Sequence, residues 1–233
     1  MDSFKEIFDG GDYVPKRKSE IETINIDWNL HAKGVVKIAK HLEPDFVINN
    51  NNSKIFRLLL LYFTGSNDFF TEYENYTGRI GSFNKGILLV GGVGTGKTLL
   101  FSIFRVYTRD ILLANSFKEY SAMDIIDSVN ISGIGVLEEF SHNMVDKIAR
   151  PIRMYVDDIA SKNETVKHFG TELNVIEQLL SLRYNVFQRY GTLTHASTNL
   201  FPSQMKDLYD QRIIDRMKEM FNIIEIGGKS FRK

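Results

Sequence analysis

The stretch Gly91-Gly92-Val93-Gly94-Thr95-Gly96-Lys97-Thr98 constrains this chain more than any other feature. It fits G-x-x-x-x-G-K-[ST], the pattern of a phosphate-binding loop. Glycine accepts positive φ and has no Cβ to block a phosphate, so the loop N–H groups can point at the anion. A short buried strand is predicted over residues 86–90 and a helix opens at Leu99. The sequence therefore predicts a strand, loop and helix that bind the phosphates of a nucleotide.

Two side chains of this loop have specific predicted roles. Lys97 places a positive charge on the β- and γ-phosphates, and the Thr98 hydroxyl binds Mg²⁺. We therefore expect ATP and Mg²⁺ as cofactors. The predicted nucleotide-binding residues are Gly91, Gly92, Val93, Gly94, Thr95, Gly96, Lys97, Thr98 and Leu99.

Composition limits the other possibilities. The 233 residues are 43% apolar, which is ample for a packed core, and they include no cysteine, which excludes disulfides and thiolate metal sites. With 29 basic and 29 acidic residues the net charge is zero, so any contact with DNA must come from a local patch. Lys16-Arg17-Lys18 is either a contact with nucleic acid or a partner, or a solvated charge run. No signal peptide or membrane span is recognisable, so we expect a cytoplasmic protein with no membrane contact.

The hydrophobic pattern predicts strands that alternate with helices, after a loosely structured stretch over residues 1–29. Helices are predicted over residues 30–42, 54–63, 99–113, 124–130, 136–148, 171–190, 203–209 and 211–221, with a short helix and a loop within 65–85. Strands are predicted over residues 86–90, 116–123, 152–157, 192–197 and 222–226. Such alternation indicates a parallel α/β sheet, which binds ligands at the carboxyl ends of its strands.

Polar side chains follow two of these strands. Asp157 and Asp158 end the strand over 152–157, and Asn199 follows the strand over 192–197. An acid at this place suits the second half of a nucleotide-hydrolysing site. We assign Asp157 to the metal, Asp158 to general base or water positioning, and Asn199 to the γ-phosphate or the attacking water.

Three arginines are further candidates. Arg212 and Arg216 project to the same side of a helix, either as intrahelical ion pairs with Asp215 and Glu219 or as an arginine that reaches a neighbouring subunit's γ-phosphate. Arg183 lies on or beside the apolar stripe of its helix, where it needs an acidic or phosphate partner. The pattern leaves open whether Arg183 is structural or serves the site.

Taken together, these motifs resemble the bacterial helicase-loader ATPases, the DnaC/IstB-like branch of the AAA+ superfamily. The motifs that carry the resemblance are Gly91–Thr98, Tyr155-Val156-Asp157-Asp158-Ile159, Arg183-Tyr184, Ser197-Thr198-Asn199-Leu200, Arg212–Met217 and Gly228-Lys229-Ser230-Phe231-Arg232. The resemblance implies an α/β P-loop fold with a five-stranded parallel sheet. The sequence departs from the larger members in that we expect it to lack their helical lid and sensor 2 arginine. It also implies an AAA+ ATPase domain over residues 46–233, after a short, mostly helical and partly disordered partner-binding segment over residues 1–45.

The resemblance also implies roles for individual residues. Asp157 and Asp158 correspond to the Walker B acids and Asn199 to sensor 1. Arg216 is the expected arginine finger, with ATP held between subunits of a ring or filament. In this branch the helices after the second strand often face DNA, which makes Lys147 and Arg150 candidate DNA contacts.

The function that follows is that of an ATP-dependent DNA-replication accessory protein, a helicase loader. It would assemble on single-stranded DNA with ATP and release a replicative helicase on hydrolysis. Two alternatives stay open from the sequence. One is an IstB-like transposition regulator that assembles on duplex DNA, and the other is a nucleotide-switched adaptor with negligible hydrolysis.

Overall fold

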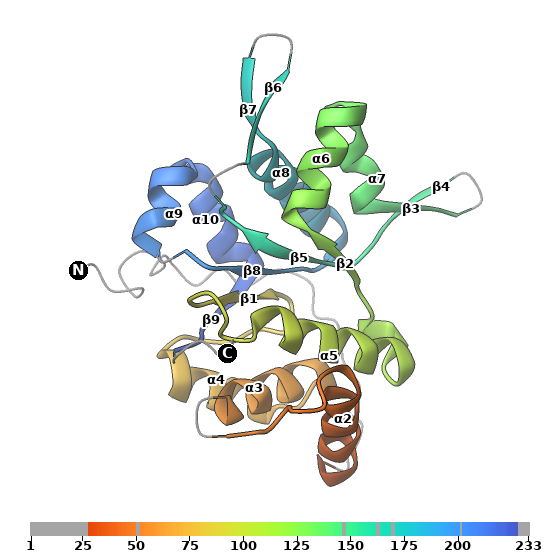
Figure 1. Cartoon of the computed structure of the whole chain (residues 1–233), viewed down its shortest axis with the longest axis vertical. Coiled ribbons are helices and arrows are strands. Elements are labelled where there is room, and N and C mark those ends of the chain that lie inside the picture. The colour runs from red at the N-terminus through yellow and green to blue at the C-terminus, as the bar shows by residue number, and fades with distance from the viewer. Residues whose placement is uncertain are drawn as a thin grey trace.

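The fold centres on a five-stranded sheet that is parallel throughout, with strand order β2-β5-β8-β1-β9 (Figure 1). The computed structural model describes residues 28–49, 52–145, 148–161, 164–168, 171–200 and 202–227. The strands are β1 (Gly86–Val90), β2 (Lys118–Ser121), β5 (Met154–Ile159), β8 (Thr194–Thr198) and β9 (Phe221–Glu225). The five-stranded parallel sheet predicted above is thereby confirmed.

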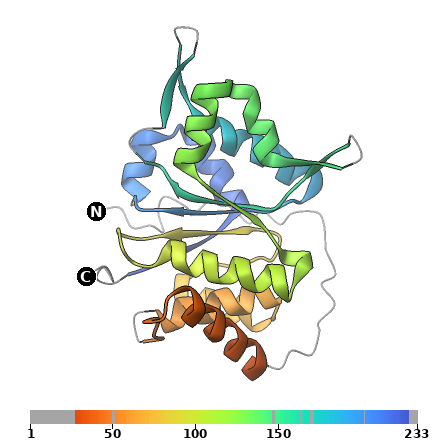
Figure 2. The ribbon, with the colours of Figure 1, turned by 45° about the vertical axis from the view of Figure 1, so that its right-hand side comes forward.

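Helices cover both faces of this sheet (Figures 1 and 2). One face carries α2 (Trp28–Leu42), α3 (Ser53–Thr64), α4 (Asp68–Thr77) and α5 (Lys97–Asp110), which is followed by the 3-10 turn η1 (Leu113–Asn115). The other carries α6 (Ala122–Ser132), η2 (Ile134–Val136), α7 (Leu137–Ser141), α8 (Val175–Tyr190), α9 (Pro202–Leu208) and α10 (Gln211–Met220). None of the helices in these described ranges is long and apolar enough to span a membrane.

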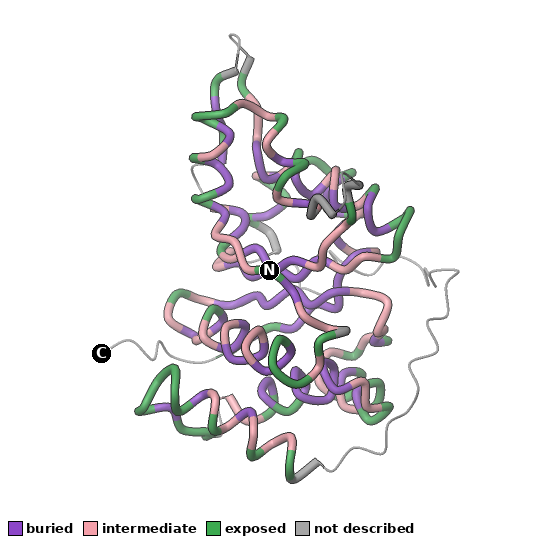
Figure 3. The backbone as a smooth tube through the Cα atoms, turned by 90° about the vertical axis from the view of Figure 1, so that its right-hand side faces the viewer, coloured by how far each residue is buried: buried purple, intermediate pink, exposed green. Residues whose placement is uncertain are grey.

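The side chains of the central strand β1 alternate between two hydrophobic clusters, one on each face of the sheet. Leu88 and Val90 pack into the cluster under α6, α8 and α10, whereas Ile87 and Leu89 pack into the cluster under α3 and α5. A strand buried on both faces reads as a continuous apolar run, which is why Gly86–Val90 was recognisable in the sequence. Figure 3 shows the buried residues running through the middle of the molecule and the exposed ones along the outer helices.

Close contacts fix the start of β1. A Cβ at Gly86 would lie 1.7 Å from the carbonyl oxygen of Thr194, so no larger residue fits there. Asn222, which is buried, donates from Nδ2 to the carbonyl oxygens of Ser82 at 2.7 Å and Lys85 at 3.0 Å. These contacts hold the segment that leads into β1 and therefore the phosphate loop that follows it.

Helix α2 packs onto the same core as α5. Val35 and Ala39 are fully buried in the cluster that contains the buried side chains of α5. The ring of His31 is hydrogen-bonded to the hydroxyl of Tyr107 on α5. The described part of the N-terminal segment is therefore docked on the face of the sheet that carries α5, while Lys16-Arg17-Lys18 lies outside the described residues.

Two helix predictions were partly wrong. Residues 136–148 form only the short helix α7 and then a hairpin of β3 (His142–Val145) and β4 (Ile148–Pro151), antiparallel with His142 opposite Pro151. Ser141, His142 and Asn143 are weak helix formers, so the helix ends where pairing with β4 begins.

The long helix predicted over residues 171–190 begins four residues late. Its first part is β7 (Thr171–Asn174), which pairs with β6 (Thr165–His168) in a second hairpin. The side chain of Asn174 accepts a hydrogen bond from the backbone N–H of Glu177 and so caps α8. The predicted end of this helix at Tyr190 is confirmed, and Gly191 caps it with a left-handed φ of 64°.

Candidate functional site

The phosphate-binding loop adopts the conformation for which its glycines are needed. Gly94 and Gly96 have φ values of 80° and 86°, a region in which a side chain is strained. A Cβ at Gly91 would lie 2.6 Å from the carbonyl oxygen of Ile226, next to β9. Lys97 is the first residue of α5, so the loop runs directly into a helix N-terminus. This geometry presents backbone N–H groups to an anion.

Lys97 joins the loop to the end of β8. It is buried, and its Nζ donates to the carbonyl oxygens of Gly91 at 2.7 Å and Gly92 at 3.0 Å. It also donates to Oδ1 of Asn199 at 2.6 Å. An ammonium at this position can donate to an anionic ligand in the loop.

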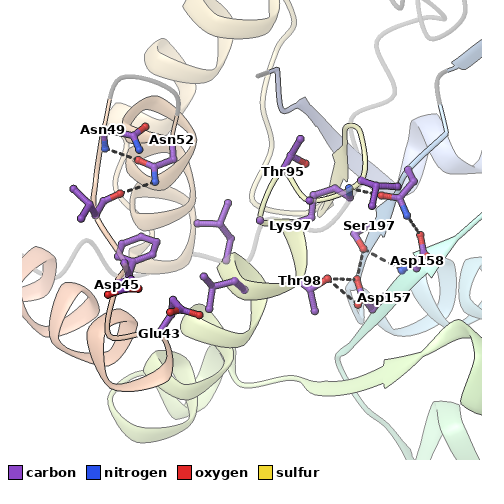
Figure 4. Close-up of a pocket in the computed structure, with 18 residues that line it drawn as sticks. Glu43, Asp45, Asn49, Asn52, Thr95, Lys97, Thr98, Asp157, Asp158 and Ser197 are labelled. Atoms are coloured by element: carbon purple, nitrogen blue, oxygen red, sulfur yellow. Dashed lines mark hydrogen bonds between the residues drawn. The ribbon is translucent and has the colours of Figure 1, made fainter. Parts of the chain in front are cut away.

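Thr98 and Asp157 lie together at the opposite side of the loop. The Thr98 hydroxyl donates to one carboxylate oxygen of Asp157 at 2.9 Å (Figure 4). A hydroxyl and a carboxylate are oxygen ligands of the kind that Mg²⁺ binds, so these two residues fit the metal that the sequence predicted.

Two hydroxyls that the sequence did not single out orient Asp157. Tyr155 and Ser197 each donate to Oδ1 of Asp157 at 2.5 Å. Both lie in the quoted motifs, Tyr155 two residues before Asp157 and Ser197 two residues before Asn199. That spacing was the available signal. Their bonds leave Oδ2 of Asp157 to Thr98 and a metal.

A β-bulge allows both acids to face the cavity. The pairing of β5 with β8 shifts between Val156 and Ile159, and Asp158 has a left-handed φ of 59°. Oδ1 of Asp158 accepts a hydrogen bond from Nδ2 of Asn199. Desolvation raises the pKa of Asp158, the Asp157 carboxylate raises it further, and Lys97 opposes both effects. Burial and the neighbouring carboxylate thus favour the protonated form of Asp158.

These residues line one cavity of about 940 Å³. Its walls include the phosphate loop, Asp157, Asp158, Ser197 and Asn199 (Figure 4). The structure therefore brings together Lys97, Thr98, Asp157, Asp158 and Asn199. The volume lies in the range of small-molecule sites.

The segment before α3 forms another wall of this cavity, which the sequence did not reveal. The cavity residues from this segment are Glu43, Asp45, Phe46, Val47, Asn49 and Asn52. Val47 and the loop residue Val93 are 64% and 61% exposed, so apolar surface lies beside the polar loop. No local sequence signal indicated that this segment packs against a loop far along the chain.

Arg183 lies away from this cavity. Its guanidinium is fully buried and donates to Thr194 Oγ1 at 2.8 Å and to the carbonyl oxygens of Ile152 at 2.9 Å and Leu193 at 3.1 Å. Ile152 and Leu193 precede β5 and β8, so Arg183 lies at the amino-terminal ends of these strands, opposite the end that carries the acids. The prediction of an acidic or phosphate partner was wrong, because neutral oxygens accept the hydrogen bonds of this arginine. Burial lowers the pKa of its guanidinium to about 10. Arg183 is structural in this conformation.

Arg216 and Arg212 lie on α10, outside the cavity. Arg216 donates to Ser181 Oγ at 2.9 Å, and its guanidinium carbon lies 4.9 Å from the centre of the Tyr184 ring. Arg212 is exposed. Asp215, expected as an intrahelical partner of these arginines, pairs with Lys218 at 2.8 Å. The arginines therefore occupy a surface next to α8.

Comparisons with known proteins agree with this architecture. No protein-family model and no curated protein matches the sequence. Among solved structures, a putative primosome component from Streptococcus pyogenes serotype M3 matches with a TM-score of 0.51 and 16% identity, over 85% of this chain and 98% of that one.

Two weaker structural matches are of the same kind. A DnaC helicase loader matches with a TM-score of 0.49 and 12% identity, over 80% of this chain and 96% of that one. AMPPCP-bound DnaA from Aquifex aeolicus matches with a TM-score of 0.47 and 16% identity, over 78% of this chain and 48% of that one. The chain thus spans about half the length of that DnaA structure. At 16% identity, the likeness to the primosome component is one of fold alone.

Proposed function

We propose that this chain is a Mg²⁺-dependent ATP hydrolase that acts as a helicase loader in DNA replication. The single observation that carries the proposal is the chain of contacts from Lys97 through Asn199 to Asp158, which lies in one cavity with the Thr98–Asp157 pair. Three separate segments contribute to it, and each contributes the group that nucleotide hydrolysis needs there.

In this proposal the loop N–H groups and Lys97 bind the phosphates. The Lys97 ammonium exchanges its bonds with Gly91 and Gly92 for phosphate oxygens, which are stronger, charged acceptors. Thr98 and Asp157 hold Mg²⁺, which neutralises phosphate charge when bound. The exposed apolar side chains Val47 and Val93 offer a surface for the base.

Hydrolysis then depends on Asp158. Its raised pKa suits a carboxylate that orients a water molecule and accepts its proton. Asn199 fixes that carboxylate through Nδ2. Arg216 of a neighbouring subunit supplies the second positive charge at the γ-phosphate, so hydrolysis requires self-association into a ring or filament.

The replication role is proposed from the motifs together with the primosome component and the helicase loader that share the fold. The partners would be a replicative helicase and single-stranded DNA. In the family resemblance, DNA faces the helices after the second strand. Residues 122–141, which form α6 and α7 here, contain Asp124, Asp127, Glu138 and Glu139 but no lysine, arginine or histidine. Arg150 and Lys147 are therefore the candidate DNA contacts in this region. Lys147 lies outside the described residues.

The same acidic charge favours one second candidate function. A nucleotide-switched adaptor would bind a protein partner and would need no surface for the DNA backbone. An IstB-like regulator on duplex DNA has no such supporting observation, because duplex DNA demands more cations along its contact face.

Fluorescence anisotropy of labelled single-stranded and duplex DNA, with and without ATP, tests this proposal. Lys97→Ala is the informative variant and Lys54→Ala, an exposed lysine on α3, is the matched control. The loader proposal predicts ATP-dependent binding to single strands that Lys97→Ala abolishes and Lys54→Ala retains. Preference for duplex would favour the transposition regulator, and no binding to either DNA would leave the adaptor.

A further inference from the structure

A buried tyrosine and a buried glutamate hold the turn that follows Asp158. Tyr209 is 3% exposed and Glu164 is 1% exposed. The Tyr209 hydroxyl accepts a hydrogen bond from the backbone N–H of Ala160 at 2.8 Å and donates to Glu164 Oε2 at 2.8 Å. Glu164 Oε1 accepts a hydrogen bond from the backbone N–H of Ser161 at 3.1 Å. One side-chain pair thus satisfies two successive N–H groups of this turn.

The turn needs such support because its backbone is strained. Asp158 and Ala160 have φ values of 59° and 62°, although neither is glycine. Residues in this region persist where the surrounding contacts over-determine them. The third contact of the turn is the bond from the N–H of Asp158 to Ser197 Oγ at 3.0 Å. Without the contacts at Ala160 and Ser161, the turn can relax and the Asp158 carboxylate loses its fixed direction.

We infer that Tyr209 and Glu164 are positioning residues for Asp158. They hold the 158–161 turn so that the carboxylate of Asp158 faces Asn199. This inference rests on the proposed function, in which Asp158 activates water. Neither side chain lines the cavity, so each acts through the turn and does not touch substrate.

The same hydroxyl connects the turn to the arginine helix. Tyr209 comes two residues before α10, and Asp210 caps that helix by accepting from the N–H of Ile213 at 2.9 Å. A displacement of the start of α10, which carries Arg212 and Arg216, therefore displaces the Tyr209 hydroxyl. The pair links the surface where a second subunit would bind to the carboxylate that hydrolysis needs.

Tyr209→Phe is the direct test, with Tyr73→Phe as the matched control. Tyr73 is also buried, and its hydroxyl also accepts from a backbone N–H, that of Ile223 at 2.9 Å. Tyr209→Phe is expected to lower kcat for ATP hydrolysis about ten- to hundredfold, with KM within about twofold, because misplacement of a reacting group acts on the chemical step. Tyr73→Phe is expected to leave kcat within about twofold.

The glutamate offers a rescue by a conservative change. A glutamine at position 164 can still accept from Ser161 and still hydrogen-bond the Tyr209 hydroxyl. Glu164→Gln is therefore expected to keep kcat within about threefold of wild type, whereas Glu164→Ala falls as Tyr209→Phe does. Equal kcat values for Tyr209→Phe and Tyr73→Phe would overturn the inference.

Amide hydrogen exchange separates this inference from the proposed function. Exchange at Ala160 and Ser161, followed by NMR without nucleotide, is expected to be about tenfold faster in Tyr209→Phe than in Tyr73→Phe. Unchanged exchange at both amides would overturn the inference even in an active enzyme. A wild-type chain without turnover would instead overturn the proposed hydrolysis, and the exchange comparison would still show whether the pair holds the turn.

Discussion

Lys97 and Asn199 are joined by a hydrogen bond of 2.6 Å that crosses from the phosphate loop to the end of β8. Because an ammonium only donates, the group of Asn199 that faces it must be the carbonyl oxygen Oδ1. The amide nitrogen Nδ2 must then face Asp158, to which it donates. The lysine thereby sets the orientation of the asparagine, and the asparagine sets that of the acid.

Asn199→Asp breaks this arrangement while it keeps the shape of the side chain. A second carboxylate next to Asp158 adds a like charge, which raises the pKa of Asp158 further. We expect turnover to fall at least about tenfold and the acidic limb of the pH–rate profile to move to higher pH. Steady-state phosphate release at several pH values measures both effects. A lower rate with an unshifted profile would contradict the role given to this contact.

Arg216 is expected to act on the nucleotide of a neighbouring subunit. Arg216→Ala should lower turnover about a thousandfold, and Arg212→Ala, one helical turn away, serves as its control. Mixing Arg216→Ala with Lys97→Ala should restore activity, because the first retains an intact cavity and the second an intact arginine. A mixture no more active than its components would refute action in trans.

Arg183 is expected to matter for stability. Arg183→Met removes the buried donor that hydrogen-bonds the oxygens of Thr194, Ile152 and Leu193. We expect the free energy of unfolding to fall by about 3 kcal/mol or more. Arg189→Met, an exposed arginine of the same helix, should change it by less than about 0.5 kcal/mol. Urea denaturation measures both variants, and equal losses would show that the buried network contributes little.

Most of the sheet was predictable from the sequence, and the reason is burial. β1, β5 and β9 are packed on both faces and therefore read as apolar runs between glycines and helices. The hairpin of β3 and β4 was not predictable, because its four-residue strands have no such run and gain their stability from pairing. Thr171–Asn174 also lacks an apolar run and was therefore predicted as the start of α8. Only the capping residue Asn174 marks the boundary between β7 and α8.

The site residues were predictable where they belong to a local motif or follow a recognisable strand. Gly91–Thr98 is local, and Asp157 and Asn199 follow strands whose ends must meet at one edge of the sheet. The contribution of Phe46 and Val47 depends on how a distant segment folds back, which no local pattern specifies. Arg183 was correctly recognised as unusual, but its neutral partners come from three separate segments and could not be read from the spacing.

Glu164 should make stability depend on pH. Burial raises the pKa of its carboxyl to about 7, from an ordinary value of 4.5. Between these values the folded state binds more protons than the unfolded state, so the free energy of unfolding decreases as pH rises. Relative to Glu164→Gln, wild type should lose about 3 kcal/mol between pH 4 and pH 8. Urea denaturation at both pH values measures this difference, and a constant difference would place the carboxyl in a more polar environment than the fold indicates.

The most direct test of the account compares wild type with Asp158→Asn for both nucleotide binding and phosphate release in the presence of Mg²⁺. The substitution keeps the size of the side chain and removes its ability to accept a proton. The account predicts similar affinity for ATP and a loss of turnover of about a hundredfold or more. Equal turnover in the two proteins, or ATP binding without any turnover in wild type, would contradict the claim that this cavity hydrolyses ATP through Asp158.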